Sequence, residues 1–246
     1  MALLTRQGES DGLPRGLEDP GQRVEDFEAA VSYLTARAGV DAGRIGLLGI
    51  CASGGYSLAA GGGDHRVQAV ATVYGVDVAR QLRLGADGTQ DPAVFQSLLD
   101  TAAQARTAAA HGEDPGVMTV FPRTAEEAHA LGGRHGAEGF EYYRTPRGRH
   151  ERSAKFLAWQ SVDKPASFDA FHAVPLIAPR PPLQIVGSRA VTSWMAGEIH
   201  QHATGPKELH WIEGAGHVDL YDKEQYIDPA IDKLTDFYTA CFTAER

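Results

Sequence analysis

A cysteine flanked by small residues is the part of the sequence best suited to chemistry. Cys51 lies in the run Gly49-Ile50-Cys51-Ala52-Ser53, which joins an apolar segment to one rich in small residues. A sharp turn from a strand into a helix lifts its central side chain above the sheet. The residues two before and two after it must then be small, because the backbone folds back on itself. Gly49 and Ser53 meet this condition, so the spacing predicts a nucleophile elbow with Cys51 as the nucleophile.

The start of the helix after this turn would help the thiol to react. A helix N-terminus lowers the pKa of a thiol and offers backbone amides to a developing oxyanion, and the Ala52 amide is the expected donor. Ser53 is the alternative nucleophile, with Gly55 two residues after it. The elbow geometry favours Cys51, because Ser53 has a cysteine rather than a glycine two residues before it. The non-catalytic alternative for Cys51 is a small, buried, inert hydrophobic residue.

A nucleophile elbow requires a base, and His217 is the candidate. It stands in Gly214-Ala215-Gly216-His217-Val218-Asp219-Leu220-Tyr221, which follows an apolar run and precedes the last predicted helix. Of the ten histidines, only this one lies in a glycine-rich segment between a predicted strand and the last predicted helix. The spacing of histidine, cysteine and acidic residues matches no metal-ligand pattern, so we expect neither a metal nor another cofactor.

Composition and charge exclude several classes of function. The chain has 246 residues, with 23 basic and 32 acidic side chains and a net charge of −9. Such a chain has no electrostatic reason to bind nucleic acid or an anionic membrane. No apolar run approaches the roughly 18 residues that span a bilayer. Cys51 and Cys241 are isolated, and residues 1–6 do not read as a signal peptide, which predicts free thiols in the cytoplasm.

The elements that must position Cys51 and His217 are predicted to form a mostly parallel sheet with helices on both faces. Short apolar runs predict strands, two of which are separated by the small-residue helix in a βαβ unit. The run 44–50 is expected to be buried on both faces. The expected strands are 44–50, 67–74, 183–187 and 208–212, and the expected helices are 19–37, 52–60, 194–202 and one starting near Asp228-Pro229.

About 100 residues separate the second predicted strand from the third, which is too long for a plain connection. We therefore expect a helical insertion or lid over residues 79–177, with helical pieces at 92–110 and 125–131, between two parts of a core at 1–78 and 178–246. Within it, Tyr143, Arg144 and Arg147 are candidates for binding substrate, with an arginine receiving an anionic group. The favoured alternative is a structural turn fixed by Pro146 and Gly148.

The chain resembles α/β-hydrolases of the dienelactone-hydrolase-like branch, in particular the group that includes polyketide-transferase-like proteins. The elbow and the segment 214–221 carry the resemblance most specifically, and together with weaker matches they follow the family's order over most of the chain. The weaker matching segments are 16–20, 142–148, 179–181, 187–188 and 206–209. The resemblance implies the α/β-hydrolase fold and a hydrolase or acyltransferase activity.

The sequence departs from the family's pattern in two places. Related proteins carry several strands before a segment like Gln7–Ser10, whereas here only residues 1–6 precede it, so we expect the N-terminal part of the sheet to be incomplete. Relatives also place an acid a few residues after the strand that ends here at Gly187, and residues 188–193 contain none. Glu198 and Asp219 are the candidate acids, although helix surface and a local cap explain them equally. A Cys–His pair can work with a weak or absent acid.

The sequence therefore predicts a hydrolase or acyltransferase that acts on an ester, lactone or thioester of a small organic acid through Cys51 and His217. The alternative is a catalytically impaired relative that binds a small hydrophobic ligand or pairs with another chain, such as a second copy, through an open sheet edge. A peptidase-like hydrolase is a third interpretation. We expect a small-molecule substrate and no nucleic-acid or membrane partner.

Overall fold

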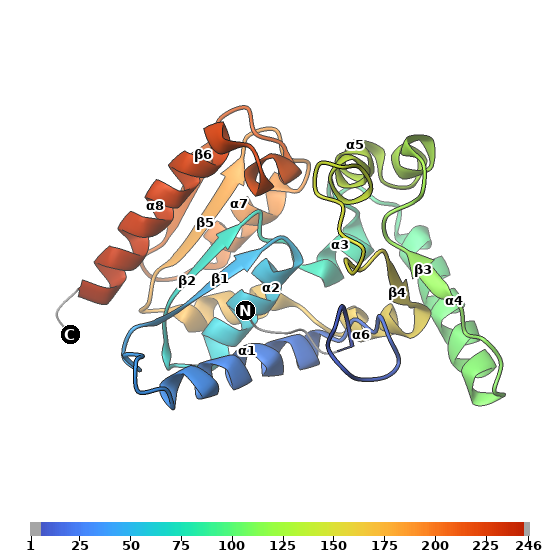
Figure 1. Cartoon of the computed structure of the whole chain (residues 1–246), viewed down its shortest axis with the longest axis horizontal. Coiled ribbons are helices and arrows are strands. Elements are labelled where there is room, and N and C mark those ends of the chain that lie inside the picture. The colour runs from blue at the N-terminus through green and yellow to red at the C-terminus, as the bar shows by residue number, and fades with distance from the viewer. Residues whose placement is uncertain (1–5, 244–246) are drawn as a thin grey trace. The chain divides into compact units, whose positions relative to one another are not determined.

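The computed structural model describes residues 6–243, which fall into two compact units (Figure 1). The first, called the sheet unit here, consists of residues 24–78 and 169–246. The second, called the insertion unit, consists of residues 1–23 and 79–168. The expectation that the N-terminal part of the sheet is incomplete was based on residues 1–6, of which 1–5 lie outside the described residues, and it stays a prediction.

The sheet unit is built on four parallel strands in the order β1-β2-β5-β6. In the register, Gly49 lies opposite Thr72 and Thr72 lies opposite Gln184, so the carboxyl ends of neighbouring strands meet at one edge. The predicted mostly parallel sheet is confirmed. The strands are β1 (Ile45–Ile50), β2 (Val67–Val73), β5 (Pro182–Gly187) and β6 (Glu208–Ile212).

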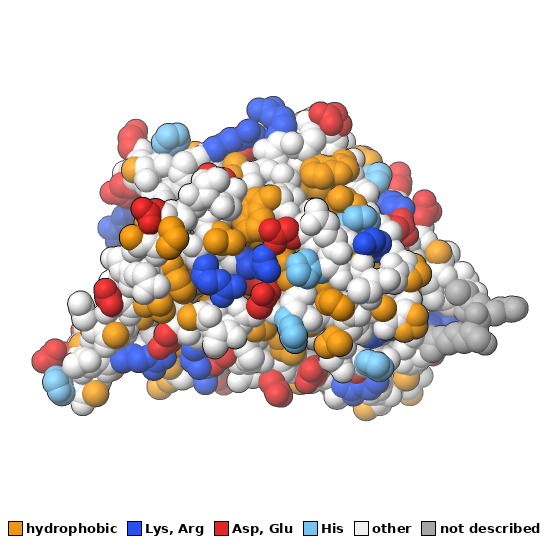
Figure 2. All heavy atoms as spheres, turned by 180° about the vertical axis from the view of Figure 1, so that it is seen from behind, with side chains coloured by type: hydrophobic (Ala, Val, Ile, Leu, Met, Phe, Trp, Pro, Cys, Tyr) orange, Lys and Arg blue, Asp and Glu red, His pale blue; other side chains and the backbone are white. Residues whose placement is uncertain are grey.

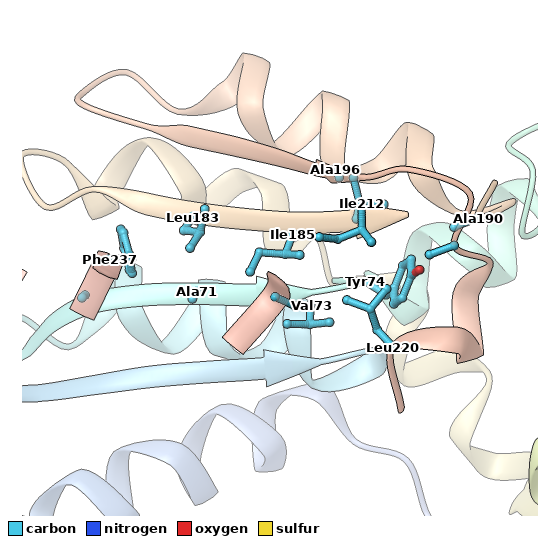
Figure 3. Packing of buried hydrophobic residues seen from close by; sticks show 14 residues of the cluster. Ala71, Val73, Tyr74, Leu183, Ile185, Ala190, Ala196, Ile212, Leu220 and Phe237 are labelled. Atoms are coloured by element: carbon cyan, nitrogen blue, oxygen red, sulfur yellow. The ribbon is translucent and has the colours of Figure 1, made fainter. Parts of the chain in front are cut away.

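Helices cover both faces of this sheet. A cluster of buried side chains from β2 and β5 packs under Phe237 and its neighbours on α8, while Val70, on the opposite face of β2, meets Gly61 of α2. Figure 3 shows the cluster running along the strands from Phe237 to Tyr74. The helices and 3-10 turns of the unit are α1 (Pro20–Thr35, from residue 24 on), α2 (Ala52–Gly63), η2 (Ala170–Ile177), α7 (Ser193–His202), η3 (His217–Tyr221) and α8 (Glu224–Thr243).

Two local expectations for this unit are wrong. Leu48 and Ile50 of β1 are 41% and 46% exposed, so β1 is buried on one face only. The apolar run predicted burial, but α8 packs against this face of β1 at Gly46, beside Tyr238 and Phe242, whereas Leu48 and Ile50 nearer the carboxyl end stay exposed. The last helix begins at Glu224 rather than near Pro229. The carbonyl of Lys223 accepts the N–H groups of Tyr226 and Ile227, which starts the helix early and leaves Pro229 inside it.

The insertion unit is mainly helical and contains one two-stranded antiparallel sheet. Its helix α5 runs to Arg144, well past the predicted end at 131, because the chain kinks at Gly132 and Gly133 and then resumes the helix. A small core forms around Phe95, Ala102 and Val162. The elements are α3 (Val78–Leu84, from residue 79 on), α4 (Pro92–Ala110), β3 (Val117–Thr119), α5 (Ala125–Arg144), β4 (Phe156–Ala158), η1 (Trp159–Ser161) and α6 (Asp163–Ala166).

The surface carries mixed charge. Figure 2 shows acidic and basic side chains interspersed over one face, without a large field of a single sign. Among residues 6–243, no helix has the length and apolar character needed to cross a bilayer.

Candidate active site

Cys51 occupies a strained turn between β1 and α2. Its φ is 54° and its ψ is −125°, a conformation that non-glycine residues rarely adopt. The turn is held by backbone bonds on both sides. The N–H of Cys51 donates to the carbonyl of Val73 at 3.1 Å, and its own carbonyl accepts the N–H groups of Gly54 at 2.8 Å and Val76 at 2.9 Å. This network fixes the position of the sulfur relative to the end of β2.

Close backbone packing explains why the elbow consists of small residues. A Cβ on Gly49 would lie 2.5 Å from the carbonyl oxygen of Ser53 and 2.6 Å from the Cα of Gly54. A Cβ on Gly54 would overlap the Cα of Gly75, just past the end of β2. The sharp turn that the sequence predicts is therefore present, and direct contacts between main-chain atoms make it tight.

Ser53, the alternative nucleophile, has its hydroxyl committed to the turn. Its Oγ donates to the carbonyl of Ile50 at 2.7 Å and accepts the N–H of the same residue at 2.8 Å. An oxygen that closes the turn in this way is oriented toward the backbone. The structure therefore gives Ser53 a role in shaping the elbow, which suits a serine two residues after the central position.

His217 lies beside Cys51. It begins η3, is 2% exposed, and places Nε2 at 3.4 Å from the sulfur of Cys51. The ring of Tyr74 packs against the imidazole at 4.9 Å between centroids and 31° between planes, and the ring of Tyr221 meets it edge-on at 6.0 Å. Figure 3 shows Tyr74 beyond the tip of β2, at the end of the buried cluster. The structure thus brings together the two residues that the sequence singled out.

The group at the other imidazole nitrogen is the hydroxyl of Thr192. Its Oγ1 lies 2.8 Å from Nδ1 of His217, and Thr192 is 2% exposed. A hydroxyl thus stands where a triad would place its acid. Sequence reasoning missed this residue because it searched for a carboxylate; its position on the loop after β5 was the available signal.

The two candidate acids lie elsewhere on the neighbouring elements. Asp219 accepts the N–H of Gly216 through Oδ2 at 2.8 Å, and its Oδ1 pairs with Lys223 at 2.6 Å. It therefore caps η3, as the local alternative expected. Glu198 lies in α7, six residues after Thr192, and is half-buried.

The surroundings of Cys51 act on its thiol in opposite directions. Burial raises the pKa of the Cys51 thiol, while the neighbouring Tyr221 hydroxyl and Ala52 backbone amide lower it. The net shift is upward, because removing a thiolate from water outweighs two neutral donors. The Ala52 amide, the expected oxyanion donor, thus acts on the Cys51 sulfur. Tyr221 is a second donor that sequence reasoning did not identify.

The candidates in the insertion unit make contacts within that unit. The Arg144 guanidinium donates to the carbonyl of Phe121, at 2.8 Å from Nε. Tyr143 stacks on the Phe121 ring at 4.2 Å. Arg147 pairs with Glu141 at 3.3 Å. These contacts give all three residues a structural role. Among residues 6–243, no group of three or more histidine, cysteine and acidic residues could hold a metal ion.

Comparison with known proteins places this site in a family. Residues 10–112 match the model of the dienelactone hydrolase family. YcjY of Escherichia coli K12 is 33% identical over 233 residues, which cover 94% of this chain and 75% of YcjY. The chain belongs to the dienelactone hydrolase family.

Two further relatives of this dienelactone hydrolase family member carry enzyme names, and a third is similar in structure. The thiohydrolase apmlB of Arthrinium phaeospermum is 29% identical over 226 residues, which cover 87% of this chain and 69% of apmlB. The crystal structure of PA2218 from Pseudomonas aeruginosa is similar with a TM-score of 0.84 at 30% identity, covering 96% of this chain and 72% of that one. The structure of the α/β hydrolase GrgF from Penicillium shares the fold, with a TM-score of 0.76 at 22% identity and coverage of 96% and 77%. The predicted α/β-hydrolase fold is confirmed.

Proposed function

We propose that this α/β hydrolase cleaves or transfers the acyl group of an ester, lactone or thioester of a small organic acid, with Cys51 as nucleophile and His217 as base. The observation that carries the proposal is the 3.4 Å between Nε2 of His217 and the sulfur of Cys51. A thiol becomes an effective nucleophile when an adjacent base takes its proton, and this distance allows a direct transfer.

The first half-reaction transfers the acyl group to the enzyme. His217 takes the thiol proton at Nε2 while the sulfur attacks the acyl carbon and forms a carbon–sulfur bond. The carbonyl oxygen becomes an oxyanion that accepts the Ala52 N–H. When the tetrahedral intermediate collapses, the bond from the acyl carbon to the leaving oxygen or sulfur breaks, and His217 returns the proton to that leaving atom.

The second half-reaction releases the acyl group. Water, or an alcohol or amine in a transfer reaction, gives its proton to Nε2 and attacks the same carbon. The carbon–sulfur bond then breaks and Cys51 recovers a proton from His217. No group outside the protein and its two substrates enters this balance, so the proposal requires no cofactor.

The names of relatives support this class of substrate, since one is called a thiohydrolase and another a polyketide transferase. A small acyl compound, rather than a nucleic acid or a membrane, is the partner we propose. Both cysteines are free, and a thiol nucleophile is kept active by a reducing cytoplasm, which is where we place the reaction.

The second candidate function is a relative that binds a small hydrophobic ligand without turnover. The observation in its favour is the raised pKa of the Cys51 thiol, which leaves little thiolate at neutral pH.

Brief exposure to an activated acetyl ester, followed by intact-mass analysis and peptide mapping, separates the two functions. We expect a single acetyl group on Cys51, trapped at low pH and absent from the Cys51→Ala and His217→Ala variants. The Cys241→Ser variant is the matched control and should label like the wild type. A folded protein that acquires no label would contradict the catalytic proposal, and a label on Ser53 would move the nucleophile by two residues.

A further inference from the structure

Thr192 occupies a helix cap but does not cap its helix. It is the N-cap residue of α7, with φ −82° and ψ 4°, and its side chain makes no capping hydrogen bond. A threonine at this position ordinarily accepts the N–H of the second or third helical residue. Here the buried hydroxyl is turned to Nδ1 of His217 at 2.8 Å instead. The chain therefore gives up a local stabilising contact and makes one to the candidate base.

The contact fixes the orientation of the imidazole and accommodates the tautomer that the proposed reaction needs. Nε2 faces the thiol and must lack a proton to accept one, so Nδ1 carries the proton and donates it to the Thr192 hydroxyl. The rings of Tyr74 and Tyr221 restrict the imidazole from two other sides. A hydroxyl can accept the Nδ1 proton as a carboxylate does, but it adds no negative charge that would stabilise an imidazolium.

We propose that Thr192 is the positioning residue of His217, and that its uncharged hydroxyl keeps the resting pair as a thiol and a neutral imidazole rather than a thiolate and an imidazolium. This inference rests on the proposed function, because it assigns how the base of that reaction is held. It makes His217 a general base that acts during the attack, and not the partner of a preformed ion pair.

The groups around the pair agree with this assignment. Tyrosine hydroxyls are neutral near neutral pH, so Tyr74 and Tyr221 add ring contacts and no charge beside the imidazole. The carboxylate of Asp219 is already bonded to the Gly216 N–H and to Lys223. Glu198 is the acid on α7, six residues after Thr192. The titratable groups on the elements around the pair include Tyr56 on α2, Tyr74 after β2, Glu198, His200 and His202 on α7, Asp219 and Tyr221 on η3, Asp222 and Lys223 before α8, and Glu224 and Tyr226 in its first turn.

Three substitutions at Thr192 test the proposal, each made in a Cys241→Ser background so that one thiol is observed. Thr192→Val keeps the shape and removes the hydroxyl, Thr192→Ser keeps the hydroxyl, and Thr192→Asp supplies the charge. Asp is also a favoured N-cap residue, so the last variant retains a compatible helix start. Circular dichroism and the thermal midpoint check that each variant is folded.

The readouts are the rate of Cys51 acetylation by the activated ester and the thiolate absorbance as a function of pH. We expect Thr192→Val to slow acetylation by about 10- to 100-fold at unchanged half-saturation, because a general base in the wrong tautomer loses most of its effect. Thr192→Ser should stay close to the wild type. Thr192→Asp should move thiolate formation to lower pH by about one to three units, as an added opposite charge stabilises the imidazolium.

Two results would overturn the inference. One is a folded Thr192→Val protein whose Cys51 is acetylated at the wild-type rate. The other is a Thr192→Asp protein whose thiolate forms at the same pH as in the wild type. Alkylation by iodoacetamide separates this failure from that of the proposed function, because it reports on the thiol without any acyl chemistry. A wild type that is never acetylated, yet whose alkylation responds to Thr192→Asp, would reject the proposed function and retain the pairing of Thr192 with His217.

Discussion

Cys51 and Tyr74 both have a positive φ, and each directly follows a strand of the parallel sheet. Cys51 follows β1 with φ 54°, and Tyr74 follows the neighbouring strand β2 with φ 50°. The carbonyl of Val73, the residue before Tyr74, accepts the N–H of Cys51. Strained residues of this kind cluster at functional sites, where the surrounding structure holds them in place. One turns a thiol toward His217, and the other lays a ring against it.

Truncating Tyr74 should therefore destabilise the fold. We expect Tyr74→Ala to lower the free energy of unfolding by about 3–5 kcal/mol, the range for losing a buried aromatic ring, because the side chain is 1% exposed. Urea denaturation followed by circular dichroism measures the loss. Tyr33 on α1 is 60% exposed and provides the control, since Tyr33→Ala should cost less than about 1 kcal/mol. Equal losses in the two variants would contradict this packing role.

The Tyr221 hydroxyl should affect the acidity of Cys51. The Tyr221 hydroxyl lowers the pKa of the thiol, so Tyr221→Phe is expected to raise that pKa and to slow alkylation by iodoacetamide near neutral pH by about 10-fold, since a hydrogen bond to a thiolate would contribute about 1.5–3 kcal/mol. Tyr226→Phe is the matched control, because the Tyr226 hydroxyl donates to the carbonyl of Gly214 at 3.4 Å. Alkylation that slows equally in both variants would argue against a specific bond to the sulfur.

Stability should depend on pH through the buried thiol. Burial raises the folded-state pKa of Cys51 above its unfolded value, so the folded state keeps the proton longer as pH rises. The stability that this thiol contributes is then complete below the unfolded pKa of about 8.5 and declines above it. The difference in unfolding free energy between the wild type and Cys51→Ala, measured under reducing conditions, should hold near neutral pH and shrink in alkaline buffer. A difference that stays constant into alkaline buffer would mean that the thiol ionises equally in both states.

Two glycines should respond in opposite directions to alanine. Gly54→Ala places a methyl group against the Cα of Gly75, so we expect loss of several kcal/mol or failure to fold, as overpacking against backbone cannot relax. Gly197 in α7 has open space where a Cβ would lie, so Gly197→Ala should raise stability by about 0.4–1 kcal/mol through helix propensity. Thermal denaturation distinguishes the two. A stable Gly54→Ala protein would show that the elbow is looser than described.

Thr72 and Gln184 form a polar pair inside the sheet. They lie opposite each other on β2 and β5, both are fully buried, and their side-chain polar atoms have no hydrogen-bond partner among the described residues. Replacing a buried, unsatisfied hydroxyl by a methyl group of similar shape should stabilise the folded state. Thr72→Val is therefore expected to raise the free energy of unfolding by about 1 kcal/mol. A loss of stability on chemical denaturation would reveal a hydrogen bond that this hydroxyl makes.

The sequence predicted best those features that depend on local pattern. Apolar runs identified β2, β5 and β6, and the small residues around Cys51 identified the elbow, because both signals depend only on residues adjacent in the sequence. The exposure of Leu48 and Ile50 could not be predicted in this way, since burial depends on which elements cover a strand. Thr192 was missed for a related reason. A threonine before a helix reads as a cap, and only the direction of its side chain reveals the contact with His217.

Main-chain contacts of the elbow position the Cys51 sulfur, so its location depends little on which side chains surround it. Because Gly54 meets Gly75 backbone to backbone, and Cys51 is tied to Val73 and Val76 through main-chain groups, the coordinates of the sulfur depend little on which apolar residues fill the neighbouring core. Under the proposed function, those residues can be exchanged, and with them the shape offered to an acyl chain, without displacing the proposed nucleophile. Divergence of substrate preference within such a framework requires no redesign of the turn itself.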